Sequence, residues 1–186
     1  MRAHRFVEPT PTGAERVEIV VAGWEIECCA PPPVVGEPTS WMLEFQPGDA
    51  DLDHEFAWDA TRWDERVTCL RRGPVTAYWA FGAGSPPAPG TAVLRGRLCG
   101  TVHGGISPDG FPACRGRVDR VRVLSQRYRE VTERTWEGVP GTVAAVDVAQ
   151  SPRWFHGGPL DGTTSVPFGV LVDVRIESGL PGDRPG

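Results

Sequence analysis

Apolar residues recur at every second position in run after run of this sequence, and this alternation constrains the fold more than any other feature. A period of two places successive side chains on opposite faces of a strand, so each run predicts a strand with one buried face. The runs are Val17/Ile19/Val21, Trp24/Ile26/Cys28, Trp41/Leu43/Phe45, Val75/Ala77/Trp79/Phe81, Ala92/Leu94/Leu98/Val102, Val121/Val123, Ala144/Val146/Val148 and Val170/Val172/Val174/Ile176. The 23 Gly and 19 Pro make 42 of 186 residues, which disfavours long helices. We therefore expect an all-β protein of about seven strands.

Such strands leave no bare edges when they close on themselves, so we expect an antiparallel small β-barrel of the OB or SH3-like kind, or a sandwich. The expected domain covers residues 15–178, and an alternative divides it into two small barrels near the Pro-rich loop 82–90. Residues 1–14 and 179–186 are rich in Pro, Gly and charge, which predicts flexible tails.

Three features interrupt the simple pattern. The parity of the apolar residues switches after Gly23, and a β-bulge at this glycine would explain the switch. Residues 49–66 place Leu52, Phe56 and Trp63 near helical spacing, so this segment is expected as an acidic loop or a helix. Residues 125–136 are polar and either extend the preceding strand or form one turn.

The charged residues exclude several classes of enzyme. All 19 basic residues are Arg, and the absence of Lys excludes a Walker-type phosphate loop, Schiff-base chemistry and a kinase-type lysine. The net charge of −5 disfavours binding of nucleic acid by the surface as a whole. Because the N-terminus lacks the apolar core of a signal peptide and no segment is apolar enough to span a membrane, we expect a cytoplasmic protein without membrane contact.

Five cysteines without an export signal predict reduced thiols rather than a disulfide framework. If the strand continues through Cys28 and Cys29, the first side chain points into the core and the second points outward. A zinc site is the alternative: Cys99, His103 and Cys114 would converge only if the strand broke at Gly100, because residues four apart on a strand lie about 13 Å from each other. The main expectation is therefore no catalytic residue and no cofactor.

Opposite charges gather in two segments. Residues 49–65 carry seven acids against one Arg, and their opening resembles a calcium loop but lacks the Gly at position six and the Glu at position twelve. An Arg-rich strand with neighbouring aromatic residues could hold single-stranded nucleic acid through phosphate contacts and stacking. Its candidate binding residues are Arg117, Arg120, Arg122, Arg127, Arg129, Tyr128 and Trp136. Pairing of these arginines with acids of the same chain is the competing interpretation.

The stretch from Gly23 to Gly36, followed by Trp41, resembles the N-terminal signature of an uncharacterised domain family of high-GC bacteria. The matching residues are Trp24, Ile26, Cys28, Cys29, Pro32, Val35 and Gly36. The chain departs from the signature at Ala30, Pro33 and Glu37, where the family usually has Gly, Phe and Asp. The resemblance extends loosely to the strand from Arg117 to Arg129. It implies a single domain of this family and transfers no catalytic residue.

These observations favour a non-catalytic β-barrel binding or interaction module with a protein, a small ligand or single-stranded nucleic acid as its partner. The alternative is a small zinc- or thiol-dependent enzyme that uses Cys99, His103 and Cys114. A third hypothesis is an oligomer whose exposed Trp residues form a subunit interface, because the chain has seven Trp.

Overall fold

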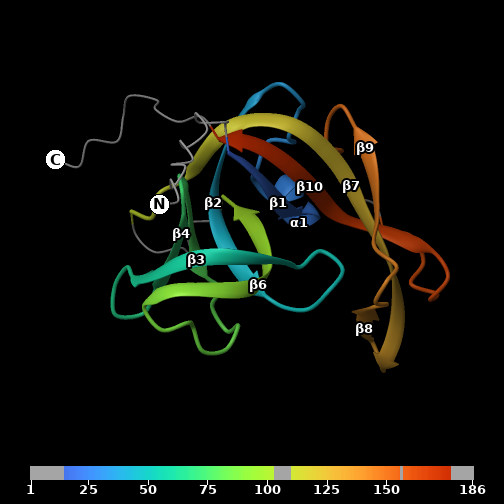
Figure 1. The fold of residues 1–186 in the computed structure, drawn as a ribbon. Coiled ribbons are helices and arrows are strands. Elements are labelled where there is room, and N and C mark those ends of the chain that lie inside the picture. The colour runs from blue at the N-terminus through green and yellow to red at the C-terminus, as the bar shows by residue number, and fades with distance from the viewer. Residues whose placement is uncertain (1–14, 103–109, 156, 177–186) are drawn as a thin grey trace, which may run out of the picture.

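A computed structural model describes residues 15–102, 110–155 and 157–176 of the chain (Figure 1). These residues form ten strands and one short helix, three strands more than the alternation predicts. The elements are β1 (Arg16–Ala22), α1 (Gly23–Cys28), β2 (Pro38–Pro47), β3 (His54–Arg62), β4 (Thr68–Arg72), β5 (Val75–Trp79), β6 (Gly90–Thr101), β7 (Cys114–Thr132), β8 (Thr135–Gly138), β9 (Ala144–Val148) and β10 (Ser165–Ile176). No helix in this part of the chain is long and apolar enough to cross a membrane.

The strands pair in one mixed sheet whose order is β10-β1-β6-β3-β4-β5-β2-β7-β8, with β9 added to β7. Two further pairings, β10–β7 and β6–β2, join strands that are distant in this order. The pairings therefore form two rings, β10–β1–β6–β2–β7 and β6–β3–β4–β5–β2, which share β2 and β6. Most pairings are antiparallel, whereas β1–β6 and β2–β5 are parallel. Figure 1 shows β7 and β10 curving together past β1, while β3 and β4 lie on the other side of β2.

The core follows the predicted alternation. Val17, Ile19 and Val21 of β1 are buried, and so are Trp41, Leu43 and Phe45 of β2. Valines 170, 172 and 174 of β10 complete one continuous apolar cluster. A smaller cluster of Val67, Cys69, Tyr78 and Phe111 packs beside β4 and β5. All-β architecture and the buried faces of these strands are confirmed.

The bulge expected at Gly23 is wrong, because a six-residue helix begins there. A Cβ atom at Gly23 would lie 2.7 Å from the Phe155 ring, so only glycine allows this close approach. The helix buries Ile26 and leaves Trp24 58% exposed, whereas the strand pattern predicts both on one buried face. A run of six residues has too few apolar positions for their spacing to distinguish a helix from a strand.

The expectation that the acidic segment is a loop or a helix is wrong for residues 54–62. These residues form β3, which pairs with β4 and β6. Alternation of Phe56 with Trp58 determines this outcome, because Trp58 is fully buried beside Phe45. Residues 125–132 extend β7, and a tight turn at Arg134, whose φ is 64°, leads into β8. The strands on the two sides of loop 82–90 pair with each other through β3–β6 and β2–β6. The domain boundaries stay a prediction.

Candidate ligand-binding cavity

A cavity of about 600 Å³ lies on the side of β1, β2 and β6 that faces away from the apolar core. In β2 the odd-numbered residues enter the core, so Glu44 and Gln46 project from the opposite face. In β6 the core takes Leu98, so Arg97, Cys99 and Thr101 project into the cavity. Cys99 is the register partner of Glu44, which places these two side chains next to each other on one face.

Segments distant in sequence cover this face. Helix α1 contributes Trp24 and Glu25, the β2–β3 connection contributes residues 49–52, and Pro140 and Val143 approach from the β8–β9 connection. Asp51 joins two of these covering segments, because its carboxylate accepts hydrogen bonds from the backbone N–H of Gly141 at 2.8 and 2.9 Å and of Val143 at 3.3 Å. Without this cover the polar residues of β2 and β6 would form an ordinary solvent-exposed sheet face.

The floor of the cavity is a chain of hydrogen bonds. Tyr78 donates its hydroxyl hydrogen to Glu44 at 3.1 Å, and the Gln46 amide donates to the other Glu44 oxygen at 3.0 Å. The Arg97 guanidinium donates to the Gln46 oxygen at 3.3 Å and pairs with Asp53 at 3.0 Å. Asp53 is buried and also accepts the backbone N–H of Ala50 at 2.7 Å. Each side chain in this chain of bonds is thus held in one orientation before any ligand arrives.

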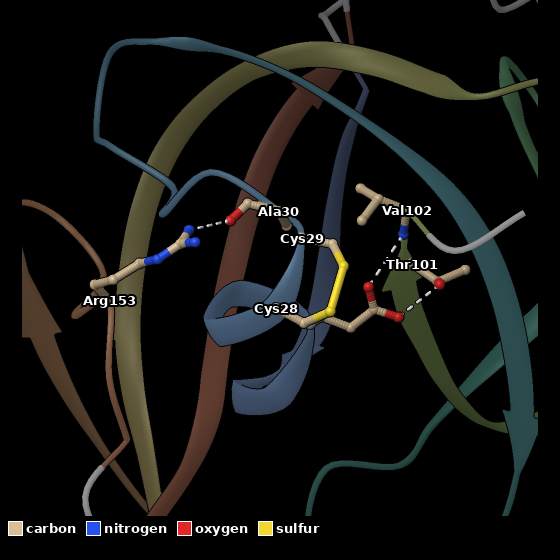
Figure 2. The surroundings of a disulfide bond; sticks show 7 residues. Cys28, Cys29, Ala30, Thr101, Val102 and Arg153 are labelled. Carbon is tan, nitrogen blue, oxygen red and sulfur yellow. Dashed lines mark hydrogen bonds between the residues drawn. A yellow bond between two sulfur atoms is a disulfide. The ribbon is translucent and has the colours of Figure 1, made fainter.

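Glu25 forms a second fixed point, where α1 meets the end of β6. Its side chain is buried and accepts hydrogen bonds from the Thr101 hydroxyl at 2.6 Å and the Val102 N–H at 3.3 Å. Figure 2 shows Thr101 and Val102 beside the last turn of α1.

A disulfide joins Cys28 to Cys29 at the end of α1 (Figure 2). The expectation of reduced thiols is therefore wrong for this pair, and so is the expectation of one inward and one outward side chain, since both residues are exposed. A strand cannot place adjacent side chains on one side, whereas the helix end does. The chain immediately after the disulfide is held by Arg153, whose guanidinium donates to the Ala30 carbonyl at 2.9 Å.

Burial governs the titration of the cavity residues. It raises the pKa of Tyr78, and the neighbouring Glu44 charge raises this pKa further, so the phenol stays protonated well above its ordinary range. Burial also raises the pKa of Cys99 to about 11, although Arg97 acts in the opposite direction. Both groups are therefore uncharged hydrogen-bond donors at neutral pH.

The predicted zinc residues are only partly described. Cys99 is the register partner of Glu44, and Cys114 is the partner of Trp41. Because positions 41 and 44 have opposite parity, the two thiols lie on opposite faces of β2. His103 lies outside the described residues. Across residues 15–102, 110–155 and 157–176, no three His, Cys, Asp or Glu side chains are grouped in a way that could hold a metal.

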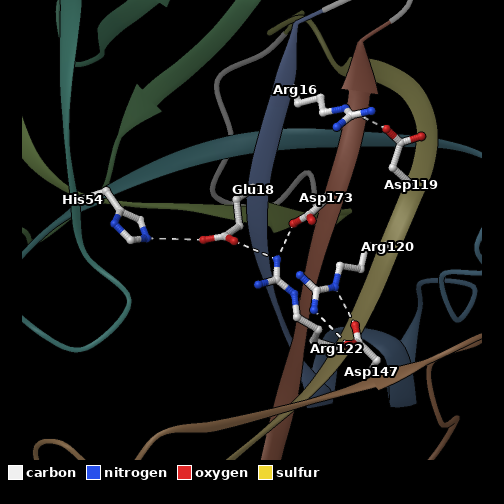
Figure 3. Close-up of polar contacts among 8 residues, drawn as sticks. All are labelled: Arg16, Glu18, His54, Asp119, Arg120, Arg122, Asp147 and Asp173. Carbon is white, nitrogen blue, oxygen red and sulfur yellow. Dashed lines mark hydrogen bonds and ion pairs between the residues drawn. The ribbon is translucent and has the colours of Figure 1, made fainter.

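Several residues of the Arg-rich strand bind acids of the same chain (Figure 3). Arg120 forms two hydrogen bonds with Asp147, of 2.5 and 2.8 Å. Arg122 contacts Glu18 at 2.7 Å and also pairs with Asp173. Arg117 donates to the Gly36 carbonyl at 2.6 Å. The acids that pair with Arg120 and Arg122 come from β1, β9 and β10, whereas the acidic segment 49–65 pairs through Asp49 and Asp53 with Arg95 and Arg97 of β6.

The other candidates of this strand lie at the β7–β8 hairpin. Arg129 is the register partner of Glu137, and Tyr128 is the partner of Gly138. Trp136 is opposite Glu130 and half-buried, and Arg127 is exposed. The hairpin therefore separates Arg127, Tyr128, Arg129 and Trp136 from the ion pairs of Arg120 and Arg122. Binding of nucleic acid by these residues stays a prediction.

The comparison with protein families covers nearly all of the described chain, because the model of a family of unknown function, DUF6578, matches residues 15–176. The chain belongs to the DUF6578 family. The expected membership of an uncharacterised domain family is thereby confirmed. The DUF6578 chain has no match among the curated proteins or among the solved structures.

Sequence reasoning missed the cavity of the DUF6578 chain, although part of the signal was present. Glu44, Gln46, Arg97 and Thr101 occupy the polar positions of two alternating runs, and polar positions of this kind usually face solvent. Of the cavity residues on β2 and β6, the sequence pattern indicates only Cys99, as a candidate zinc ligand. The covering segments come from three other parts of the chain, so no local pattern indicates that this face is covered.

Proposed function

We propose that this DUF6578 chain is a non-catalytic binding domain for a small molecule, and that the cavity above β1, β2 and β6 is its binding site. The observation that carries the proposal is a polar floor, fixed by hydrogen bonds through Glu44, inside a cavity with apolar walls. A volume of about 600 Å³ is within the range of small-molecule sites. Leu52, Pro140 and Phe168 provide apolar wall, and the fixed polar groups supply orientation.

The pairing of the strands supports this role for the scaffold. We infer that the ring β10–β1–β6–β2–β7 closes as a small barrel of the OB kind, because each of its strands pairs with the next and the last pairs with the first. The core fills the interior of such a ring. A ligand in the cavity would therefore bind to the outer face of this barrel.

The titration of the cavity favours binding over thiol chemistry. A nucleophilic cysteine needs a lowered pKa, because the thiolate is the reactive form. Burial instead raises the pKa values of Cys99 and Cys114 to about 11. Both thiols are therefore protonated at neutral pH, which supports the binding module over the thiol-dependent alternative.

A variant that fills the cavity tests the proposal. Val143→Trp places an indole in the cavity from the β8–β9 connection, away from the core. Val146→Trp is the matched control, since Val146 is 62% exposed on β9 and does not line the cavity. Saturation-transfer NMR with a library of soluble organic fragments measures binding to the wild-type chain and both variants. We expect that some fragments bind both the wild-type chain and Val146→Trp, and that these fragments do not bind Val143→Trp. Fragments that bind all three proteins equally, or none of them, would overturn the proposal.

A further inference from the structure

The charged residues that line the cavity are predominantly acidic. Glu25, Glu44, Asp49 and Asp51 face it, and Arg97 is the basic residue of the described lining. A partly enclosed site strengthens the effect of a net charge, because water screens the charge less there than on an open surface. The sign of the charge that remains after internal pairing therefore selects the class of ligand.

Internal contacts involve these charged residues in different ways. Asp49 pairs with Arg95 at 2.7 Å, and the Asp51 carboxylate binds the backbone of the β8–β9 connection. The positive charge of Arg97 is matched by Asp53, whose side chain is fully buried at 3.0 Å from the guanidinium. Arg97 is thus committed to a partner behind the cavity floor. An anionic ligand would have to compete with Asp53 for it.

Glu44 differs from Asp49 and Arg97 because the partners of its carboxylate are neutral, and it lies on the cavity floor rather than in the cover, where Asp51 lies. Within the described residues its carboxylate accepts hydrogen bonds from the Tyr78 hydroxyl and the Gln46 amide. These bonds orient the carboxylate but leave its negative charge uncompensated, since Tyr78 keeps its proton and an amide carries no charge. A carboxylate offers about four acceptor positions, so Glu44 retains room for a further donor.

The walls around Glu44 suit an organic body rather than a bare ion. Trp24 lines the cavity with 58% of its surface exposed, and Leu52 and Phe168 provide further apolar surface. An aromatic face attracts a cation in addition to apolar groups. Glu25 adds a second carboxylate on the same lining, where it binds Thr101, two residues from Cys99 along β6. A metal ion alone would occupy a small part of about 600 Å³.

We propose that the cavity binds a small organic cation, a protonated amine with an apolar body, whose ammonium group donates to Glu44 while the body packs against Trp24 and the apolar wall. This inference rests on the proposed binding function. It assigns Glu44 as the anchor, Tyr78 and Gln46 as the residues that position it, and Trp24 as the aromatic contact.

Matched compounds test the class of ligand. The probes are aryl- and alkylamines, each with the alcohol and the carboxylic acid of the same carbon skeleton, titrated by calorimetry at neutral pH and low salt. We expect the amines to bind at least about tenfold more tightly than their alcohols, and the acids to bind most weakly. High salt is expected to weaken the amines and leave the alcohols unchanged.

Variants of Glu44 assign the preference to one residue. Glu44→Gln keeps the shape and removes the charge, so the advantage of amine over alcohol should disappear. Glu44→Asp keeps the charge and should retain part of the advantage. Glu55→Gln is the control, because Glu55 is exposed on β3 and lies outside the cavity lining. Urea unfolding of each variant verifies that it folds. If Glu44→Gln does not fold, Glu44→Asp still tests the role of the carboxylate.

The outcomes separate this inference from the proposed function. If alcohols or acids bind as tightly as the amines, and Val143→Trp abolishes that binding, the cavity is a binding site but its ligand is not a cation. An amine preference that survives in Glu44→Gln would overturn the role of Glu44. If no probe binds the wild-type chain, or if Val143→Trp leaves binding unchanged, both the binding site and its cationic ligand are rejected.

Discussion

Tyr78 on β5 and Glu44 on β2 are register partners in a parallel strand pair, and the Tyr78 hydroxyl donates to the Glu44 carboxylate at 3.1 Å. This bond joins the apolar cluster beside β4 and β5 to the polar floor of the cavity, because Tyr78 belongs to both. It also fixes the carboxylate that we assign as the anchor for a ligand.

Removal of this hydroxyl should destabilise the protein. In Tyr78→Phe the Glu44 carboxylate loses a donor in a partly buried site, so we expect the free energy of unfolding to fall by about 1–2 kcal/mol. Urea unfolding followed by circular dichroism measures the change. Tyr128→Phe is the control, since Tyr128 is half-buried on β7 outside the cavity lining. An equal loss in both variants would contradict a specific role of the Tyr78–Glu44 bond.

The buried thiols should make the fold less stable in alkali. The pKa values of Cys99 and Cys114 rise from 9.0 to about 11 on folding, so between these pH values the unfolded chain releases protons that the folded chain keeps. Stability is therefore fully present below pH 9 and falls as the pH approaches 11, by about 2 kcal/mol for each thiol. Urea unfolding at several pH values measures this slope, which should be shallower in Cys99→Ala. Thiolate absorbance of the folded protein is assigned to Cys99 where it is absent from Cys99→Ala. If that absorbance titrates near pH 9, the prediction is contradicted.

Asp51 should control the cover of the cavity. Its carboxylate holds the N–H groups of Gly141 and Val143, so Asp51→Ala should loosen the β8–β9 connection and speed hydrogen exchange at these two amides at least about tenfold. Asp49→Ala is the control, because Asp49 lies in the same β2–β3 connection as Asp51 but pairs with the exposed Arg95 of β6. NMR hydrogen exchange measures both variants. Unchanged protection in Asp51→Ala would show that other contacts hold the cover.

The two ion-paired arginines of β7 should differ in their contribution to stability. Arg122 is 14% exposed between Glu18 and Asp173, so Arg122→Met would leave two carboxylates close together and should cost about 2–4 kcal/mol. Arg120 pairs with Asp147 on the exposed surface, and Arg120→Met should change stability little. Thermal and urea unfolding compare the variants, with Asp173→Asn added to Arg122→Met as a partial rescue. Equal effects of the two substitutions would refute this distinction.

The disulfide predicts how many cysteines react with an alkylating reagent. Cys69, Cys99 and Cys114 are free, whereas Cys28 and Cys29 are joined. Iodoacetamide under denaturing, non-reducing conditions should therefore modify three cysteines, and prior reduction should expose all five. Intact-mass spectrometry counts the added groups. Five modified cysteines without reduction would show that Cys28 and Cys29 are thiols.

The local pattern predicts much of the strand content of this chain and little of its connectivity. Alternation places Val17, Ile19 and Val21 correctly in the core, because burial of one strand face requires only a period of two. The same reasoning fails at Trp24 and Ile26, where a six-residue helix imitates a strand pattern. It also misses β3, in which Phe56 and Trp58 alternate within a segment that helical spacing fits equally well.

Composition and alternation by themselves determined that this chain forms strands around an apolar core, because burial of apolar surface acts on every residue along the chain. The tertiary structure alone decided that Glu44 stands beside Cys99 and Tyr78 under a cover formed by α1 and two connections. These contacts join residues far apart in the sequence, and strand pairing depends on which strands meet, a choice that no short segment encodes.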